Sequence, residues 1–356
     1  MKTYFFCTYF DKNYSAKGLA LYYSIQKHVQ SFRLYILCLD NETHAVLSHL
    51  KLPSVILIPL EELEQHDPEL FATKKNRTLI EYYFTLTPAF ILHIIKEFPD
   101  IDIISYVDAD MFLFAPITPA YDEMGDNSIL IIEHRFSKEE RFREIHGRFN
   151  VGYLSFRRDE EGQKCLELWR KQCIEWCYDR IEGEKFADQK YLDRWPSIYS
   201  KIIVLRHLGV NVAPWNANNY IFHKEGESQY YVDEYPLILY HFHALHEILH
   251  IFNYFIYDMN LSTYNFLRKA QREQGLQIKK EIYDKYLSIY MICCRIIDDN
   301  LLHCDIKQGS IRGEVNNNNS GVTIQFSKKP SVKYSTILKK FFWNDLIIIK
   351  RSRKKI

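Results

Sequence analysis

Hydrophobic residues in the first 135 positions form short runs, separated by stretches in which they recur every three or four residues. The short runs have the length and composition of buried strands, and lie at residues 4–8, 34–39, 55–58 and 101–107. Helical spacing follows the first run, at Leu19, Tyr22, Ile25 and Val29. This alternation predicts an α/β fold, in which a Rossmann-like, mostly parallel mixed sheet is flanked by helices.

Two cap signals and several later patterns extend this prediction. Ser15 can cap the first helix, and Thr87-Pro88 predicts a helix with Thr87 as its cap and Pro88 as its first residue. Further strands are predicted at residues 128–132, 151–156, 202–205 and 237–242. Further helices are predicted at about 160–178 and 187–194.

The pattern changes at about residue 244, where helical periodicity replaces the strand signals. Three helices are predicted, over residues 245–257, 262–274 and 279–302. Residues 305–320 are polar and rich in turn formers, which is typical of a linker. We therefore divide the chain into an α/β domain (1–243), a helical appendage (244–304), a linker (305–320) and a basic, aromatic-containing C-terminal tail (321–356).

Composition and charge narrow the class of protein. With 47% hydrophobic and 26% charged residues, the chain resembles an ordinary folded protein rather than a disordered or fibrous one. Its eight cysteines lack paired zinc-type spacing, so we expect buried free thiols. The N-terminal apolar run is short and ends at Asp11, which indicates a strand rather than a signal sequence. No run reaches the roughly 18 apolar residues that span a bilayer.

The tail is strongly basic although the whole chain has a net charge of only +1. Residues 328–356 hold ten Lys or Arg against one Asp, beside the apolar residues of 341–343 and 346–349. Such a segment favours an anionic membrane surface. No nucleic-acid-binding fold accompanies it, so we expect no nucleic-acid partner. We predict a cytoplasmic protein, attached peripherally to the inner face of the membrane.

The strongest chemical signal is Asp108-Ala109-Asp110, which directly follows an apolar strand. In extended backbone both carboxylates project to one face. Two such carboxylates repel unless a proton, a basic partner or a cation lies between them, and their hard oxygens suit Mg²⁺ or Mn²⁺. The carboxyl end of a parallel sheet is also where α/β folds bind ligands. Alternatively, both residues only form a turn, where Asp is common.

This segment resembles the Asp-x-Asp (DXD) metal motif of GT-A glycosyltransferases. From about Thr3 to Leu245 the chain is similar to the bacterial family 8-like members, which are nucleotide-diphospho-sugar transferases. The resemblance implies a GT-A fold, a metal and a nucleotide-sugar donor, with UDP as the expected nucleotide. The acceptor would be a glycan or a lipid-linked molecule, and attachment through the tail would suit a lipid-linked acceptor in surface polysaccharide biosynthesis.

Further motifs carry the resemblance in the expected order, and each implies site residues. Contacts to the donor are implied for Thr8, Tyr9, Tyr14, Arg77, Asp108, Ala109, Asn150, Gly152 and Asn211. In the Asp-Gln segment, Asp188 would bind sugar hydroxyls and Gln189 would lie near the anomeric carbon, as the catalytic pair. The alternatives are an ordinary strand end for the tyrosines, a solvated surface position for Arg77 and a helix cap for Asp188.

A histidine is implied as the third metal ligand. His241 matches the first position of the family's His-Phe segment, and His243 is the alternate. Imidazole favours Mn²⁺ over Mg²⁺. The chain departs from the family pattern here, because Ala244 replaces the usual Gly and no Lys-Pro-Trp follows.

A competing motif lies next to it. His246-Glu247-Ile248-Leu249-His250 matches the His-Glu-x-x-His pattern of zinc metalloproteases, which requires a helix. The usual third-ligand pattern does not follow it. Another alternative is a non-catalytic protein that binds a nucleotide sugar or glycan without turnover. We predict a metal-dependent glycosyltransferase of the hexosyltransferase type.

Overall fold

The computed structural model describes residues 2–243, 245–251, 254–258, 276–301 and 347–350. These residues fall into two units. The first holds residues up to His243 together with the long helix α10 (Leu276–Leu301), and the second holds three strands from the later part of the chain. Each unit is described by itself below.

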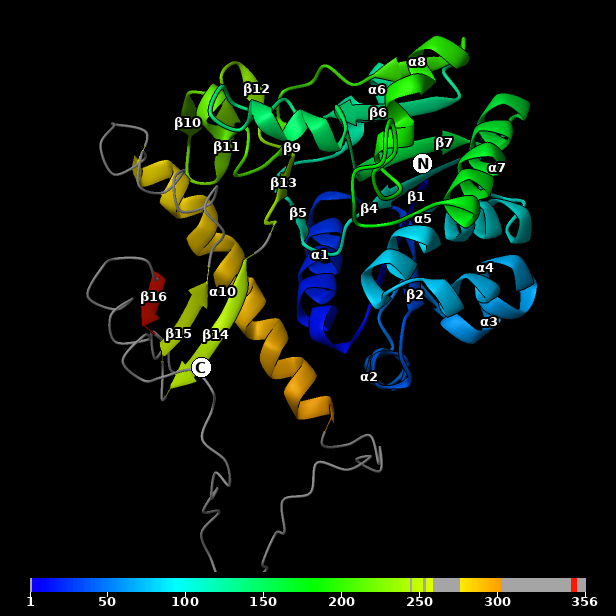
Figure 1. The fold of residues 1–356 in the computed structure, drawn as a ribbon. Helices are drawn as coiled ribbons and strands as arrows, with labels where there is room; N and C mark the ends of the chain where they lie inside the picture. The colour runs from blue at the N-terminus through cyan, green and yellow to red at the C-terminus, as the bar shows by residue number, and fades with distance from the viewer. Residues whose placement is uncertain (1, 244, 252–253, 259–275, 302–346, 351–356) are drawn as a thin grey trace, which may run out of the picture. The chain divides into compact units, whose positions relative to one another are not determined.

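A seven-stranded sheet forms the centre of the first unit (Figure 1). Its members are β1 (Tyr4–Phe10), β2 (Phe32–Cys38), β3 (Val55–Pro59), β4 (Ile103–Val107), β6 (Ile129–Glu133), β7 (Phe149–Arg157) and β8 (Ile202–Val204). The strand order is β3-β2-β1-β4-β7-β6-β8, and only β7 runs antiparallel to its neighbours. The predicted mostly parallel, mixed α/β sheet is therefore confirmed.

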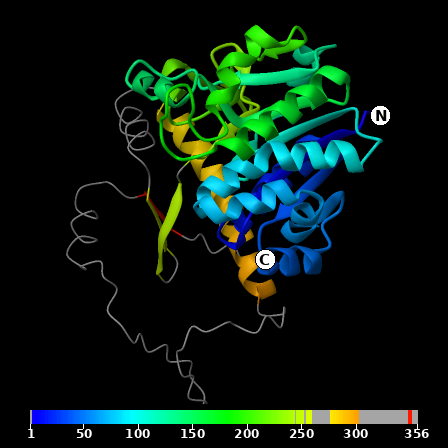
Figure 2. The same cartoon turned by 45° about the vertical axis from the view of Figure 1, so that its right-hand side comes forward.

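Helices cover both faces of this sheet (Figures 1 and 2). The α-helices are α1 (Ser15–His28), α2 (Asn41–Leu50), α3 (Leu60–His66), α4 (Pro68–Thr73), α5 (Leu79–Glu97), α6 (Thr118–Met124), α7 (Glu160–Glu175) and α8 (Trp195–Ile198). Short 3-10 helices are η1 (Lys12–Tyr14), η2 (Lys74–Asn76), η3 (Arg141–His146), η4 (Lys190–Arg194) and η5 (Ala217–Asn219). Alternate residues of β1 contribute to opposite faces, so that Cys7 joins the core cluster that also contains the buried residues of α5 and α7.

Three local predictions are corrected. Helix α5 begins at Leu79, because Thr78 and Glu81 form a capping box: the Glu81 N–H donates to the Thr78 hydroxyl at 3.4 Å. Thr87 and Pro88 thus lie inside α5, where Pro88 has no N–H to donate. Ser15 is the first residue of α1 and does not cap it. The predicted helix at 187–194 is the 3-10 helix η4, followed by α8.

A second, three-stranded sheet extends the first unit beside β4. It pairs β5 (Met111–Leu113) with β13 (Leu239–His241) in antiparallel fashion, and β13 with β9 (Val210–Val212) in parallel. Helix α10 packs on β13: the Phe242 ring stacks on Tyr286 at 3.8 Å between ring centroids, and the hydroxyls of Tyr240 and Tyr283 lie 3.2 Å apart. The helix predicted at 279–302 therefore supports this small sheet. A separate meander comprises β10 (Phe222–Glu225), β11 (Gln229–Val232) and β12 (Tyr235–Pro236).

The second unit is an antiparallel sheet of β14 (His246–Ile251), β15 (Tyr254–Asp258) and β16 (Ile347–Lys350). The helix predicted for residues 245–257 is therefore wrong. The segment is rich in Ile, Phe and Tyr, and β-branched and aromatic residues favour strands. The helix at 262–274, the linker at 305–320 and all of the tail except β16 lie outside the described residues, and the domain boundaries remain a prediction.

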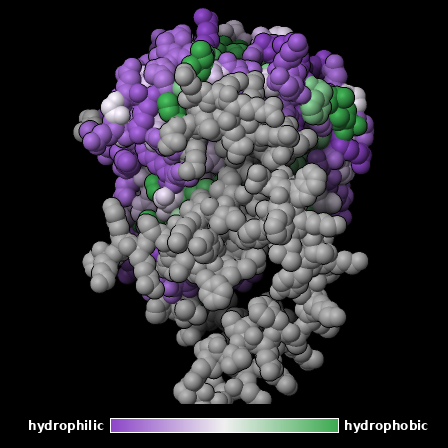
Figure 3. Space-filling model, turned by 90° about the vertical axis from the view of Figure 1, so that its left-hand side faces the viewer, coloured by the Kyte–Doolittle hydropathy of each residue, from purple (hydrophilic) through white to green (hydrophobic). Residues whose placement is uncertain are grey.

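The polarity of the described surface and the state of the described cysteines are those of an ordinary folded domain. On the face shown in Figure 3 the described residues are mostly hydrophilic, and hydrophobic ones gather only in small groups. The described cysteines are free, and all are buried except the partly exposed Cys294. Within the described part of the chain, no helix has the length and hydrophobicity needed to cross a bilayer.

Candidate active site

The Asp108-Ala109-Asp110 segment forms a turn at the carboxyl end of β4. The Met111 N–H donates to the Asp108 carbonyl at 3.0 Å, and the Asp110 carbonyl accepts from the Phe242 N–H at 2.9 Å. The extended backbone assumed from the sequence is therefore wrong for Ala109 and Asp110. The turn nevertheless brings both carboxylates near the same nitrogen, Nε2 of the His241 imidazole.

His241 lies against both aspartates because β13 pairs with β5, placing His241 opposite Met111. Its Nε2 is 3.0 Å from Asp110 Oδ1 and 3.7 Å from Asp108 Oδ2. His241 is 3% exposed, and its Nδ1 is buried without a hydrogen-bond partner. One ligand atom each from Asp110, His241 and His243 lie within 4.8 Å of one another. Carboxylate oxygens, imidazole nitrogens and an unpartnered ring nitrogen fit a divalent cation such as Mn²⁺.

The charges in this cluster depend on one another. Burial alone would raise the pKa of Asp110, but the His241 imidazole and the Lys17 ammonium hold it well below its usual range. Burial raises the pKa of Asp108, with Asp110 adding to the effect. Burial opposes protonation of His241, yet the two carboxylates raise its pKa above the usual value. Without a ligand, the two carboxylates therefore favour the protonated form of the His241 imidazole.

Gly152 of β7 forms the floor beneath Asp108. A Cβ at this position would lie 2.7 Å from Asn150 Oδ1, 2.7 Å from Met111 Cε and 2.9 Å from Asp108 Oδ2. The Gly152 N–H donates to Asn150 Oδ1 at 3.1 Å, and the Asn150 amide nitrogen lies 3.2 Å from His134 Nε2. A methyl group here would force the ends of the Asn150, Met111 and Asp108 side chains to shift, so glycine leaves the Asp108 carboxylate its place.

Asp188 and Gln189 enter the cleft from the segment before η4. Ala187 precedes them with φ of 46°, a left-handed conformation that turns the chain inward. Asp188 is 4% exposed, and burial, with a contribution from Asp108, raises its pKa to about 7. The Gln189 side-chain amide donates to the His146 carbonyl at 3.1 Å. The pair thus places a carboxyl group that changes its charge near pH 7 beside an anchored amide.

Tyrosines line another part of the cleft. The Tyr9 hydroxyl donates to the Tyr83 carbonyl at 3.0 Å and lies 3.0 Å from the Thr87 hydroxyl. The Tyr106 hydroxyl donates to Asp108 Oδ1 at 2.8 Å and so orients that carboxylate. Tyr14 also lines this cleft. Rings held by their hydroxyls in this way offer flat apolar surfaces to a ligand.

These groups share one cleft of about 660 Å³. The predicted site residues that line it are Tyr9, Tyr14, Asp108, Ala109, Asp110, Asn150, Gly152, Asp188, Gln189 and His241, together with the alternate His243. Three predicted residues do not line it. Thr8 is fully buried, Asn211 is fully buried with its amide donating to the Glu133 carbonyl at 3.3 Å, and Arg77 stacks 3.9 Å over the Tyr178 ring.

Several lining residues were not named as site residues from the sequence, namely Thr87, His134, Phe136, Arg143, His146 and Trp215, although the resemblance placed the segment of Trp215 near the cleft. Trp215 packs on both histidines, with ring centroids 5.1 Å from His241 and 5.3 Å from His243. His134 directly follows β6, as Asp108 follows β4, so its position after a strand was the available signal. Arg143 and His146 belong to η3, for which the sequence pattern gave no indication.

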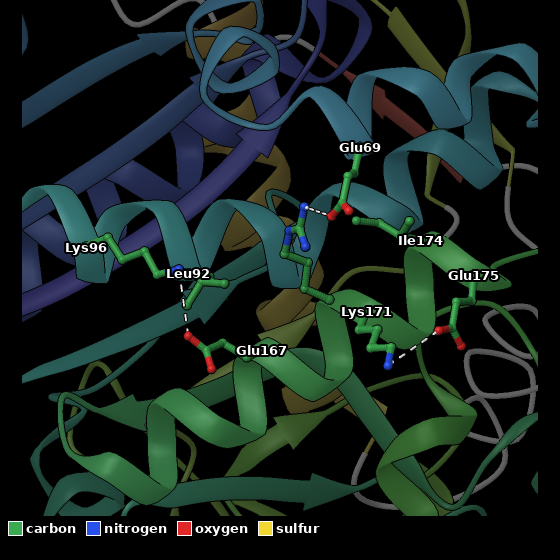
Figure 4. A pocket seen from close by; sticks show the side chains of 8 residues that line it. Glu69, Leu92, Lys96, Glu167, Lys171, Ile174 and Glu175 are labelled. Carbon is green, nitrogen blue, oxygen red and sulfur yellow. Dashed lines mark hydrogen bonds and ion pairs between the residues drawn. The ribbon is translucent and has the colours of Figure 1, made fainter.

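Another depression lies between α5 and α7 and holds several charged side chains (Figure 4). Its charges pair with one another: Lys96 lies 3.7 Å from Glu167, Lys171 lies 3.9 Å from Glu175, and Arg170 lies 2.9 Å from Glu69. Exposed pairs of this kind are common on protein surfaces. We assign no site to this depression.

The metalloprotease alternative is corrected by the structure. His246 and His250 lie on strand β14 and not on a helix. Residues four apart in a strand are separated by about 13 Å, against about 6 Å on a helix. The motif therefore lacks the helix that the zinc-protease pattern requires.

A mostly parallel sheet with one reversed strand, flanked by helices and ending in an acidic cleft that contains histidine, makes this an α/β protein of the Rossmann-like kind that the sequence predicted. No family model matches the chain. It is 34% identical over 248 residues to the uncharacterized protein YfnD of Bacillus subtilis, covering 68% of this chain and 78% of YfnD. It is 32% identical over 244 residues to the uncharacterized protein YfnF, covering 67% and 80% respectively. The chain belongs to the family of these two Bacillus proteins.

A solved structure is similar at lower identity. The galactosyltransferase LgtC, in complex with donor and acceptor sugar analogs, matches with 17% identity and a TM-score of 0.47, covering 67% of this chain and 87% of LgtC. The likeness is distant. We therefore infer the function of the chain from the residues of its own cleft.

Proposed function

We propose that the chain is a metal-dependent glycosyltransferase of the family 8-like type, which transfers a sugar from a UDP-sugar to a glycan or lipid-linked acceptor. One observation carries this proposal. Asp108, Asp110 and His241 converge at the carboxyl end of the sheet, in a cleft that also holds the buried Asp188. The cleft volume of about 660 Å³ suits a ligand of nucleotide-sugar size.

Asp108, Asp110 and His241 would hold the metal, with His243 as a further donor. The bound cation, Mn²⁺ rather than Mg²⁺ because of the imidazole, would neutralise charge that develops on the leaving nucleoside diphosphate. The protein contributes the orientation of these ligands. Tyr106 fixes one oxygen of Asp108, and Gly152 leaves room for the carboxylate above it.

Asp188 and Gln189 would position the donor sugar. A carboxyl group with a pKa of about 7 can accept or donate a hydrogen bond to a sugar hydroxyl near neutral pH. The Gln189 amide nitrogen is held by His146, which leaves its carbonyl oxygen to contact the sugar. Ala109, Asn150 and Gly152 would contact the donor from below.

Tyr9 and Tyr14 would bind the base of the nucleotide. Both line the cleft near the aspartates, and an aromatic ring stacks on a base at little conformational cost. Of the other predicted donor contacts, Thr8 and Asn211 would act from behind the lining residues. Arg77 is fixed by its contacts to Tyr178 and to the Ile174 carbonyl at 3.2 Å.

A thermal-shift screen with UDP, GDP and CDP sugars, each with and without Mn²⁺, tests the proposal. We expect a metal-dependent rise in melting temperature with the UDP compounds. Asp110→Ala should abolish the rise. Asp102→Ala is the matched control, because Asp102 is an exposed aspartate just before β4 that pairs with Arg157 at 2.9 Å. Stabilisation that is independent of metal, or that persists in Asp110→Ala, would contradict the proposal.

Turnover separates an enzyme from a protein that only binds sugars. Glycosyltransferases of the proposed kind release nucleotide slowly without acceptor, whereas a binding protein leaves the donor intact. We expect Mn²⁺-dependent release of UDP from at least one UDP-sugar. Binding without any release from a panel of UDP-sugars would favour the non-catalytic alternative.

We also propose that the basic tail attaches the chain peripherally to the inner, anionic face of a bacterial membrane, where a lipid-linked acceptor would lie. The support is the sequence of residues 328–356, with ten Lys or Arg against one Asp. Replacing Arg351, Arg353, Lys354 and Lys355 by Gln spares β16 and should reduce sedimentation with anionic liposomes. Unchanged sedimentation at low salt would contradict this attachment.

A further inference from the structure

His134 is a buried histidine that lines the cleft and is hydrogen-bonded at both ring nitrogens. It directly follows β6, and the pairing of β6 with β7 brings it opposite Arg148. The His134 backbone N–H donates to the Arg148 carbonyl at 3.0 Å, and Nδ1 lies 3.2 Å from the same carbonyl oxygen. On the other side of the ring, Nε2 lies 3.2 Å from the side-chain amide nitrogen of Asn150.

These contacts determine the tautomer of His134. A carbonyl oxygen only accepts hydrogen bonds, so Nδ1 carries the proton that is donated to Arg148. In a neutral imidazole, Nε2 then keeps its lone pair and accepts from the Asn150 amide. Burial lowers the pKa of His134 to about 3, so the ring is neutral at physiological pH.

The same contacts determine the orientation of the Asn150 amide. Its Oδ1 accepts from the Gly152 N–H at 3.1 Å, and its nitrogen donates to His134. Turning the amide over would place two donors together at Gly152 and two acceptors together at His134. The amide has a second N–H, for which the described residues provide no further side-chain hydrogen bond. Because Asn150 lines the cleft, this N–H is available to a ligand.

His134 is itself held firmly. Its ring stacks on Phe136 with 4.5 Å between centroids and meets the Trp215 ring edge-on at 5.5 Å. Its carbonyl oxygen accepts from the Trp215 indole N–H at 3.0 Å and from the Asn216 amide at 2.8 Å. The position of the Nε2 acceptor is therefore fixed, as the orientation of a ligand-binding group requires.

Asn150 lies on β7 between the proposed metal ligands and the proposed sugar contacts. Two residues further along the chain, a Cβ at Gly152 would lie 2.9 Å from Asp108 Oδ2. Three residues before Asn150, a Cβ at Gly147 would lie 3.3 Å from Gln189 Cγ. A neutral amide N–H in this place suits a sugar hydroxyl oxygen as its acceptor.

We propose that His134 is a positioning residue for the donor sugar. It holds the Asn150 amide so that an N–H, and not the carbonyl oxygen, faces the cleft and donates to a hydroxyl oxygen of the sugar. This inference rests on the proposed function and extends it to a residue that was not named as a site residue from the sequence. Binding of the sugar would depend on His134, whereas binding of the nucleotide would not.

His134→Phe tests this assignment, because phenylalanine keeps a flat ring against Phe136 and Trp215 and removes both nitrogens. The probes are UDP, UDP-glucose, UDP-galactose and UDP-N-acetylglucosamine, each titrated calorimetrically in the presence of Mn²⁺. For the UDP-sugar that the wild type binds best, we expect the affinity to fall by about 3- to 10-fold, the effect of one hydrogen bond. The affinity for UDP should not change.

A double-mutant cycle shows whether His134 acts through Asn150. Asn150→Ala alone should weaken binding of the same UDP-sugar, and adding His134→Phe to it should have no further effect. His134→Gln should retain more affinity than His134→Phe, because glutamine offers both an acceptor oxygen and an N–H donor.

His207→Phe is the matched control. His207 also packs on an aromatic ring, that of Tyr235 at 4.9 Å, and its Nδ1 accepts from the Gly209 N–H at 3.2 Å. It does not line the cleft. We therefore expect His207→Phe to leave the affinities for UDP and for the UDP-sugar unchanged.

The tautomer can be measured without relying on His134→Phe to fold. Nitrogen-15 NMR of the histidine-labelled wild type, with the His134 signals assigned by their loss in His134→Gln, should show the neutral form protonated at Nδ1 at pH 7. A proton on Nε2 would overturn the assignment, because that nitrogen could then not accept from Asn150.

The outcomes separate this inference from the proposed function. If His134→Phe leaves binding of the UDP-sugar unchanged, or weakens UDP and the UDP-sugar equally, the assignment of His134 is wrong and the proposed function stands. A further loss on adding His134→Phe to Asn150→Ala would also overturn it, because His134 would then act independently of Asn150. If the wild type binds no UDP-sugar with Mn²⁺, both proposals fail.

Discussion

The floor and the rim of the cleft differ in how the chain holds them. The floor, which we define as Asp108, Asp110, Gly152, Asp188 and His241, is mostly buried, and four of its residues lie in or next to strands β4, β5, β7 and β13. The rim, which we define as Ile80 at the start of α5 and the residues of η3 (141–146), is exposed: Phe142 by 70%, Ile145 by 53% and Ile80 by 48%. Individual hydrogen bonds hold the rim, such as the one that the Lys190 ammonium donates to the Ile145 carbonyl at 2.7 Å.

Under the proposed function, this difference would give the two ends of the cleft different tasks. The floor has fixed carboxylates, an imidazole and no room for an added methyl group, which suits binding of one donor geometry. The rim has exposed apolar side chains and weaker attachment, which suits recognition of an acceptor. Substitutions in the floor should therefore affect donor binding and stability, whereas substitutions in the rim should affect transfer alone.

The largest expected effect is on metal binding. His241→Ala should weaken Mn²⁺ binding by roughly 10³-fold. Loss of an outer-shell partner typically weakens metal binding by roughly 10- to 100-fold. The larger effect is expected because the variant loses a direct ligand and leaves two buried carboxylates without their imidazole. His243→Ala should weaken it by about 10-fold, because His243 mainly packs on the Trp215 ring at 5.3 Å. Calorimetric titration with MnCl₂ measures both. A larger loss in His243→Ala would reverse the assignment of the two histidines.

The pH dependence of stability probes Asp188. Its pKa is about 7 when folded and about 4 when unfolded. Between these values the folded chain keeps a proton that the unfolded chain has lost. The contribution of Asp188 to the free energy of unfolding is therefore greatest below about pH 4. It decreases between about pH 4 and pH 7, by at most about 4 kcal/mol in total.

Asp188→Asn lacks this titration. The free energy of unfolding of the variant, relative to the wild type, should increase from pH 5 to pH 8 in urea unfolding experiments. Parallel pH profiles for the two proteins would show that Asp188 does not titrate in the floor as described.

Gly152→Ala tests how tightly the floor is packed. Its methyl group would press on Asp108 Oδ2 and Met111, so we expect a loss of about 1–3 kcal/mol in stability and weaker UDP binding with Mn²⁺. Gly183→Ala is the control, because nothing lies within 4 Å of its added methyl and only its left-handed backbone, with φ of +60°, costs about 1 kcal/mol. Equal UDP affinity in both variants would argue against a closely packed floor.

The smallest expected effect is in the rim. Phe142→Ser should change the free energy of unfolding by less than about 0.5 kcal/mol, because the side chain is 70% exposed. Release of UDP without acceptor should be unchanged, while transfer to the acceptor slows. A fall in acceptor-free release as large as in the floor variants would remove the distinction between floor and rim.

The floor was largely predictable from the sequence, because most of its residues lie in or after strands that short apolar runs predict. Asp108, Asp110 and His241 each lie at the end of such a run, and parallel strands end at one edge. The geometry was less predictable. The turn at Asp108 depends on the pairing of β5 with β13, two short strands more than a hundred residues apart in the chain.

Features that depend on long-range contacts or on local helix caps were not predicted from the sequence. Thr87 was interpreted as a helix cap, but Thr78 with Glu81 begins α5 nine residues earlier, and Thr87 instead contacts Tyr9 in the cleft. Trp215 and His134 reach the site only through the folded arrangement of β6 and β9. Lys17 lay within a clear helical pattern, where a lysine is usually exposed, and only its burial distinguishes it.

Acceptor-free release of UDP from a panel of UDP-sugars, compared between the wild type and Asp110→Asn with Mn²⁺ and with chelator, tests the central claim most directly. Asparagine preserves the shape of the side chain and removes the charge that holds the cation. We expect Mn²⁺-dependent release by the wild type, lost with chelator and reduced by about 10³-fold in Asp110→Asn, since a bound cation contributes several kcal/mol to stabilising the leaving group. Equal release by the variant, or wild-type release that chelator does not affect, would contradict a metal-dependent glycosyltransferase built on Asp108, Asp110 and His241.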